Sequence, residues 1–342
     1  MHRTLSVTAL AALALGGGIP AHAQAQEGQV VNLYSYRQEY LIRPLLDLFE
    51  KDTGIQTNVV YASDGILERL RAEGENSPAD AILTVDITRL VAHAEADTLQ
   101  PVESEVLEAN VPATYRHPEG LWFGLTARAR IFAYAEDRVD PARIATYDAL
   151  ADPELGYTVC TRSGKHPYMQ SLTAFMIAEE GVDATRQWAE GLKANLGRKP
   201  NGGDRDQVKA VSAGECDLAV LNSYYVGGML SDEEQHAWME GVGLVFPNQE
   251  TTGTHVNISG AGVTKGAKNR EAAVRLVEFL SSPIAQRMFA EQNFEYPVTP
   301  GIEPAALVES WGDFRRADIN LADVADHAAE AARLMDEVDY DG

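Results

Sequence analysis

Val30-Val31-Asn32-Leu33-Tyr34 is an apolar run that opens a region of alternating strand-like and helix-like segments. Residues 57–62 and 81–85 are two further runs of the same kind. Between these runs, residues 41–51 and 66–72 carry apolar side chains at helical spacing. This order of strand, helix, strand, helix and strand predicts a parallel sheet that is covered by helices on both faces.

The middle of the chain predicts a change of lobe. Residues 123–125 and 131–134 are apolar strands that can cross from one lobe to another, and residues 256–263 form the return crossing. A second α/β series is expected from the helices at residues 168–180 and 204–213, the strand at 218–221, and the later helices at 270–281 and 321–338. The predicted fold is therefore α/β, with two discontinuous lobes joined by two crossing strands. A ligand is expected in the cleft between the lobes, beyond the carboxyl ends of strands.

The crossings set the predicted domain boundaries. Lobe 1 comprises residues 28–127 plus about 254–302, and lobe 2 comprises residues 128–253 plus about 303–342. Three of the predicted helices begin beside residues that typically cap helices. These are Ser63-Asp64, Asn222-Ser223 and Asn320.

Residues 1–23 have the features of a secretory signal peptide. Arg3 supplies a positive charge, residues 5–20 are mostly apolar, and Ala21-His22-Ala23 is a small-x-small cleavage sequence. We therefore expect export to the periplasm, with cleavage near Ala23.

The chain has two cysteines, Cys160 and Cys216. An even number of cysteines in an exported chain indicates a disulfide. Both lie at or beside predicted strands, so that pairing within one lobe is geometrically plausible. Two separate free thiols are the alternative.

The formal net charge is −23. A chain this acidic is a poor partner for nucleic acid or for anionic lipid. After the predicted signal peptide, no segment is apolar enough to predict a membrane span, so we do not expect an integral membrane protein.

Tyrosines stand at three predicted junctions between a strand and a helix. In Leu218-Ala219-Val220-Leu221-Asn222-Ser223-Tyr224-Tyr225, a buried strand runs into a capping pair and then into two tyrosines. Tyr168 follows Pro167 at the start of another helix, and Tyr40 follows the first strand. A pair of tyrosines alone more often serves packing, but three such junctions bring phenols to one cleft.

Phenols in a cleft suit ferric iron. Fe(III) is a hard cation that prefers anionic oxygen ligands. A phenol keeps its proton near neutral pH, but a bound trivalent ion stabilises the phenolate and displaces that proton. Several phenolates can then neutralise the charge of the ion.

The sequence resembles the periplasmic ferric-iron-binding proteins of ABC importers, a bacterial transferrin-like family, and in particular its all-tyrosine branch. The resemblance covers nearly the whole chain after the signal peptide. It is most specific in the double tyrosine and in Tyr168-Met169-Gln170-Ser171-Leu172. Other matching stretches are Asn32-Leu33-Tyr34-Ser35, Thr53-Gly54-Ile55, residues 79–86, residues 124–130, residues 203–207, residues 259–263 and residues 295–298.

The resemblance implies a type II periplasmic solute-binding protein that carries Fe(III) as cargo. It further implies a monomer that delivers the ion to an inner-membrane ABC permease. Carried over by position, Tyr168, Tyr224 and Tyr225 match the iron-ligating tyrosines of the family. Arg128 matches a cleft arginine, which would stabilise phenolates or help to close the lobes; an exposed or ion-paired arginine is the alternative.

The ligand from the first lobe is where this sequence departs from the family pattern, which often reads Ser-Arg-His-Tyr. Here the run is Tyr36-Arg37-Gln38-Glu39-Tyr40. Gln38 stands at the position of the histidine, and Glu39 stands at that of the tyrosine unless one residue is inserted. We expect Tyr40 to be the ligand, with Glu39 as the alternative, because either supplies an anionic oxygen.

The sequence offers little support for an enzyme. It contains no His-Glu-x-x-His helix, no G-x-S-x-G elbow, no P-loop, and no G-x-G-x-x-G after a strand. Two other functions remain open, since the fold alone cannot decide between them. One is a carrier of an organic or oxyanion solute such as a polyamine, sulfate or thiamine, and the other is a periplasmic enzyme.

Overall fold

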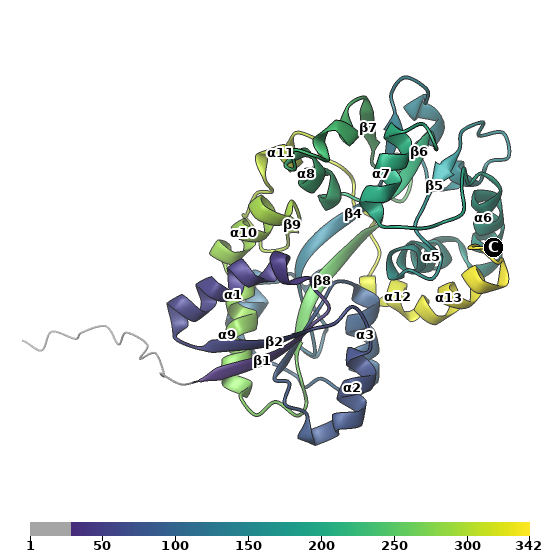
Figure 1. Cartoon of the computed structure of the whole chain (residues 1–342). Helices are drawn as coiled ribbons and strands as arrows, with labels where there is room; N and C mark the ends of the chain where they lie inside the picture. Colours follow the sequence, from purple (N-terminus) through teal and green to yellow (C-terminus); the bar gives the residue numbers. More distant parts are fainter. Residues whose placement is uncertain (1–28) are drawn as a thin grey trace, which may run out of the picture.

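The computed structural model describes residues 29–342, so the predicted signal peptide lies outside the described residues. The first part of the chain forms the predicted parallel sheet (Figure 1). β1 (Val30–Ser35) pairs in parallel with β2 (Gln56–Tyr61) on one side and with β3 (Ala81–Thr84) on the other. Between and after these strands lie α1 (Glu39–Thr53), α2 (Ile66–Glu73) and α3 (Ile87–Glu95). The alternating pattern of residues 30–85 is therefore confirmed.

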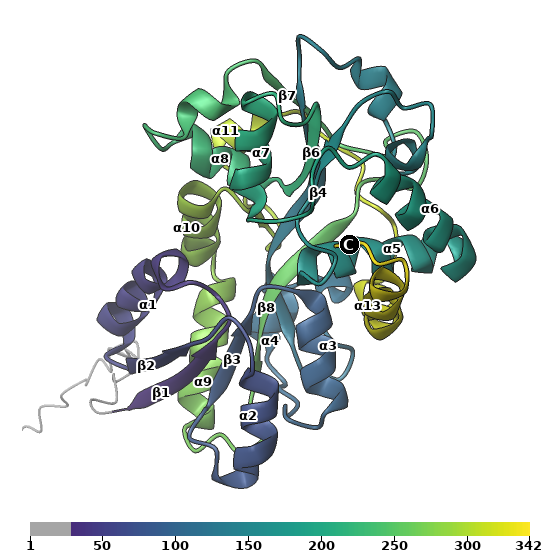
Figure 2. The same ribbon diagram turned by 45° about the vertical axis from the view of Figure 1, so that its right-hand side comes forward.

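One long strand, β4 (Phe123–Ala135), belongs to both parts of the sheet (Figure 2). Its first half pairs with β8 (Val256–Val263), ending at Ala129, whose partner is Val256. From Arg130 onward it pairs instead with β6 (Leu218–Asn222) and β7 (Val242–Val245). The ladder thus changes partners between two consecutive residues, where the chain passes from one group of helices to the other.

The prediction of two separate strands at residues 123–125 and 131–134 was wrong, because β4 continues through the residues between them. Arg128 and Arg130 interrupt the apolar pattern there. Each of them is only 2% exposed. Arg128 pairs with the buried carboxylate of Asp86, and Arg130 pairs with that of Asp204. These ion pairs allow two arginines to occupy the interior of a strand.

The second α/β series follows the crossing. It contains β5 (Val159–Cys160), α5 (Pro167–Glu180), α6 (Val182–Ala194), α7 (Asp204–Ser212), β6 and α8 (Tyr224–Leu230). The strand order is β2-β1-β3-β8-β4-β6-β5, with β7 and the short β9 (Tyr296–Pro297) also paired to β4. The other helices are α4 (Glu105–Asn110), α9 (Arg270–Ser281), α10 (Pro283–Asn293), α11 (Ala306–Glu309), α12 (Leu321–Asp326) and α13 (Ala328–Glu337). The predicted α/β class is confirmed.

The helix predicted at residues 321–338 is two helices that meet at His327. α12 packs against both α3 and α5, whereas α13 packs against α5 (Figure 1). The break allows each piece to bury its own apolar face. The predicted cap at Asn320 is confirmed, since its side-chain oxygen accepts a hydrogen bond from Ala322 N at 3.0 Å.

Two predicted caps were wrong. α2 begins after Gly65, whose φ of 80° turns the chain into the helix, and neither Ser63 nor Asp64 caps it. Ser223 precedes α8, but its hydroxyl accepts a hydrogen bond from the backbone of Ala129 at 3.2 Å. Ser223 therefore joins β4 to the end of β6 instead of capping the helix.

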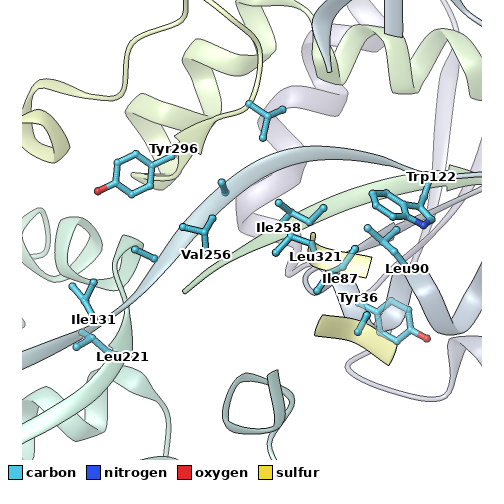
Figure 3. Packing of buried hydrophobic residues seen from close by; sticks show 14 of the residues in the cluster. Tyr36, Ile87, Leu90, Trp122, Ile131, Leu221, Val256, Ile258, Tyr296 and Leu321 are labelled. Atoms are coloured by element: carbon cyan, nitrogen blue, oxygen red, sulfur yellow. The ribbon is translucent and has the colours of Figure 1, made fainter. Parts of the chain in front are cut away.

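Buried apolar side chains lie along β4 and β8 (Figure 3). Among the residues labelled there, Trp122 and Leu90 lie on one side, and Ile131 and Leu221 lie on the other. The predicted disulfide between Cys160 and Cys216 is present. Within residues 29–342, no helix combines the length and the apolar character needed to cross a membrane.

Candidate metal-binding site

Three tyrosines meet where β6 ends and where α5 begins. Tyr224 and Tyr225 open α8 directly after β6, and their rings stack with centroids 4.3 Å apart. Tyr168 is the second residue of α5, after Pro167. Its phenol oxygen lies 3.3 Å from that of Tyr224. The structure therefore brings together the three tyrosines that the sequence placed at separate junctions.

These phenols line one cavity together with side chains from the start of α1 and from β8. Tyr40 and Gln38 reach it from the start of α1, and Ser259 reaches it from β8. Arg128 and Arg37 add positive charge to its wall. The cavity thus lies between the two α/β series, which agrees with the predicted place of the ligand.

Arg128 is buried beside this cavity. Its guanidinium donates to the carbonyl of Val85, lies 3.6 Å from the carboxylate of Asp86, and lies 5.7 Å from the centre of the Tyr168 ring. It is therefore an ion-paired arginine that also borders the phenols. The two interpretations offered by the sequence are compatible in the structure.

Further arginines surround Tyr168, and the sequence analysis did not single them out. The guanidinium of Arg162 lies 5.2 Å from the ring centre, and that of Arg130 lies 5.9 Å from it. Both contact the buried carboxylate of Asp204, which also accepts a hydrogen bond from Asn222 N at 2.8 Å. The sequence did contain a signal for Arg130. It lies two residues after Arg128 on the same strand, so that both side chains point to the same face.

Burial keeps two of the phenols protonated. It raises the pKa of Tyr224 well above its ordinary value, and the neighbouring phenols of Tyr168 and Tyr225 raise it further. The pKa of Tyr225 is raised mainly by burial, although the charge of Arg162 acts in the opposite direction. In the metal-free protein both groups are therefore neutral near pH 7, and a cation that binds their oxygens must displace protons.

The two candidate ligands from the first lobe lie differently. Tyr40 lines the cavity and is 58% exposed. Glu39 is exposed at the start of α1, and its charge contributes, after burial, to the raised pKa of Tyr61 on β2. The geometry thus places Tyr40 nearer to the phenols, but it does not join either side chain to them.

A buried ion pair supports the short segment between β1 and α1, which precedes Tyr40. Arg37 pairs with Glu295 and donates to Ser259 Oγ at 3.0 Å. Thr126 Oγ1 donates to the same carboxylate at 2.9 Å. The sequence analysis missed this pair because its two residues are 258 positions apart.

His166 lies at the edge of the phenol cluster. Its Nδ1 accepts a hydrogen bond from Tyr168 N at 3.1 Å, so that it caps α5. Burial lowers the pKa of His166 to about 3, with smaller contributions from Arg162 and Arg130. The imidazole is therefore neutral at physiological pH and is occupied as a helix cap.

The amino-acid sequence is similar to those of known proteins. The family model of bacterial extracellular solute-binding proteins matches residues 34–287. The chain is 44% identical over 317 residues to iron uptake protein A1 of Synechocystis sp. (strain ATCC 27184 / PCC 6803 / Kazusa), a match that covers 92% of this chain and 88% of that protein.

Solved structures agree with the sequence matches. The apo ferric ion-binding protein A of Pasteurella haemolytica superposes with a TM-score of 0.88 at 50% identity, covering 92% of this chain and 99% of that one. A Trichodesmium protein in complex with iron and citrate superposes with a TM-score of 0.85 at 41% identity, covering 91% and 99%. The fold is the predicted type II periplasmic binding protein fold. From the sequence match and from these structures, the chain belongs to the family of bacterial extracellular solute-binding proteins.

Proposed function

We propose that this protein binds ferric iron in the periplasm and delivers it to an inner-membrane ABC importer, without acting as an enzyme. The ion is held as cargo by the phenolate oxygens of Tyr168, Tyr224 and Tyr225, and Tyr40 completes the set from the first lobe. The protein acts as a monomer after its signal peptide has been removed near Ala23. Relatives whose names state ferric-ion binding or iron uptake support this proposal.

The observation that carries the proposal is the convergence of three phenols from two separate junctions on one cavity. The oxygens of Tyr168 and Tyr224 are 3.3 Å apart, and Tyr225 stacks on Tyr224. Packing alone gives no reason for three phenols to meet beside a polar cavity. A trivalent cation does, because it can bind several anionic oxygens at once.

Arginine side chains around the phenols are compatible with this chemistry. Deprotonated phenols carry negative charge, and Arg128, Arg130 and Arg162 lie within 6 Å of the ring of Tyr168. Positive neighbours favour the charged form of an acid. The arginines therefore lower the cost of forming phenolates in a buried place.

We propose that the lobes have the boundaries predicted from the sequence and close around the ion. The change of partners in β4 between Ala129 and Arg130 supports a hinge there, with Val256, the first residue of β8, and His255 before it as its neighbours. Closure about these positions would carry Tyr40 towards the other three phenols.

The test is a visible spectrum and a metal assay of protein isolated from the periplasm. A ferric–tyrosinate site gives a coloured protein, whereas a carrier of organic solutes is colourless. Tyr224→Phe and Tyr225→Phe keep the ring but remove one anionic oxygen each, and we expect both to weaken binding and to shift or bleach the band. Tyr34→Phe is the matched control, because this buried phenol bonds to Glu73 and not to the site. Wild-type iron affinity and colour in both site variants would show that the assignment is wrong.

A further inference from the structure

Tyr340 and Asp341, which lie shortly after the end of α13, contact a loop of the candidate site. Asp341 accepts two hydrogen bonds with its two carboxylate oxygens, one from Gly164 N at 2.8 Å and one from Ser163 Oγ at 2.5 Å. The hydroxyl of Tyr340 lies 2.8 Å from that of Thr161. Figure 2 shows this end of the chain beside α5.

The contact of Tyr340 is close and buried, whereas Asp341 and Ser163 are half-buried. Tyr340 and Thr161 are each 1% exposed. A Cβ atom on Gly164 would come within 2.9 Å of the Tyr340 ring, so that only a glycine permits this approach. Burial raises the pKa of Tyr340, which therefore contributes a neutral hydroxyl. The tyrosine belongs to the core that α5 and α13 share.

The loop that these residues hold runs from the end of β5 to the start of α5. It carries Arg162, whose guanidinium lies 5.2 Å from the Tyr168 ring, and it ends at His166, the cap of α5. Tyr168 follows two residues later. A displacement of this loop therefore moves a phenol and the charge beside it together.

We propose that Tyr340 and Asp341 are positioning residues of the iron site. They fix the loop of residues 161–166, and through it they set the distance between the Arg162 guanidinium and the phenols of Tyr168 and Tyr225. This inference rests on the proposed binding of Fe(III). It assigns to the segment after α13 an effect on the ion, although neither residue lines the cavity of the phenols.

Asp341 binds the loop with both of its carboxylate oxygens. An amide in place of the carboxylate keeps one accepting oxygen, and its NH2 group can only donate, so that the Ser163 hydroxyl must turn from donor to acceptor if Gly164 N keeps its partner. Both contacts also lose the negative charge that strengthens a hydrogen bond. The weakened contacts hold the loop less firmly, and a shift of the loop reaches Arg162 and His166.

The decisive comparison is Asp341→Asn against Asp339→Asn. Both remove one negative charge from the same segment, but Asp339 is exposed and pairs with Lys193 at 3.4 Å. We expect Asp341→Asn to weaken Fe(III) binding by about 3- to 10-fold and to shift the phenolate-to-iron band. Asp339→Asn should stay within about twofold of the wild type, because it loses an exposed ion pair.

Ser163→Ala provides a second test that leaves every charge in place. It should also weaken Fe(III) binding. Its effect should not add to that of Asp341→Asn, because both changes affect the same contact between Ser163 and Asp341. If Asp341→Asn does not fold, the result for Ser163→Ala decides. Affinity is measured with ferric citrate and a competing chelator, and thermal unfolding of the metal-free variants is measured in parallel.

Two results would overturn this inference alone. One is equal loss of affinity in Asp341→Asn and Asp339→Asn, which would indicate a plain effect of charge. The other is lower thermal stability of Asp341→Asn and Ser163→Ala with wild-type affinity and an unshifted band, which would indicate a purely structural contact. A wild-type protein that binds no Fe(III) would overturn the proposed function, and this inference with it.

Discussion

The phenol oxygens of Tyr168 and Tyr224 lie 3.3 Å apart, although the two residues are 56 positions apart in the sequence. Each stands at the start of a helix that follows one of the neighbouring parallel strands β5 and β6. At this distance two phenolate charges repel each other strongly unless a cation lies between them. The loss of the Tyr224 proton is therefore coupled to the arrival of a metal ion.

This coupling predicts a steep dependence of iron affinity on pH. The pKa values of Tyr224 and Tyr225 are raised, so both phenols are protonated below about pH 9 in the metal-free protein, and binding must release both protons. The logarithm of the affinity should therefore rise with pH with a slope of about 2 or more between about pH 5 and 7. Competition with a chelator of known proton affinity measures this slope.

Tyr225→Phe is the control for the pH dependence. It removes one proton from the exchange, so the slope should fall by about 1 while the remaining affinity stays measurable. A slope near zero in the wild type would contradict phenolate ligation. An unchanged slope in Tyr225→Phe would remove this residue from the ligand set.

A separate pH effect concerns the stability of the metal-free protein. The pKa of His166 is lowered to about 3 in the fold, mainly by burial, from an ordinary value of about 6.5. Its contribution to stability is therefore fully present above about pH 6.5 and is lost as the pH falls towards 3. Protonation also removes the Nδ1 acceptor that caps α5.

His166→Asn tests this effect, because asparagine is a good helix cap that does not titrate. Between pH 7 and about pH 4.5, the free energy of unfolding should fall less in the variant than in the wild type. Allowing for the partial exposure of the imidazole, we expect a difference of about 1–2 kcal/mol. Urea denaturation at the two pH values gives this number, and parallel losses in both proteins would refute the argument.

The disulfide should stabilise the part of the sheet that carries the phenols. Cys160 ends β5, Cys216 precedes β6, and both are fully buried. Mass spectrometry without reduction should show them linked, with no thiol available to alkylation. The double variant Cys160→Ala/Cys216→Ala should lose about 2–4 kcal/mol of unfolding free energy. Equal stability of the double variant and the oxidised wild type would contradict this expectation.

Local patterns predicted much of the fold because each strand and helix of residues 30–85 is marked by its own residues. The pattern failed where a tertiary contact decides. Arg130 looks like a break in a strand until Asp204 is seen beside it, and His327 lies inside a continuous helical pattern that α3 and α5 divide into two helices.

The same division applies to the site. Tyr168 and the double tyrosine could be predicted because each phenol follows a local junction of strand and helix. Arg37 and Glu295 could not be predicted as a pair, because only the folded sheet brings them together. The contact of Asp341 with Gly164 is of this second kind, since the two residues are 177 positions apart.

The last prediction decides which residue the first lobe contributes. Tyr40 lines the cavity, whereas Glu39 is exposed at the start of α1. If the lobes close around the ion, Tyr40→Phe removes an anionic oxygen from a trivalent cation, and we expect the affinity to fall about tenfold or more, with a shift of the visible band. Glu39→Gln should change the affinity by less than about threefold, because it removes only an exposed charge. The reverse order of effects would assign the ligand to Glu39 and would mean that no residue is inserted relative to the family pattern. Small-angle scattering separates ligation from closure. If Tyr40 binds the ion in the closed form of the protein, then Tyr40→Phe with iron should be less compact than the wild type with iron.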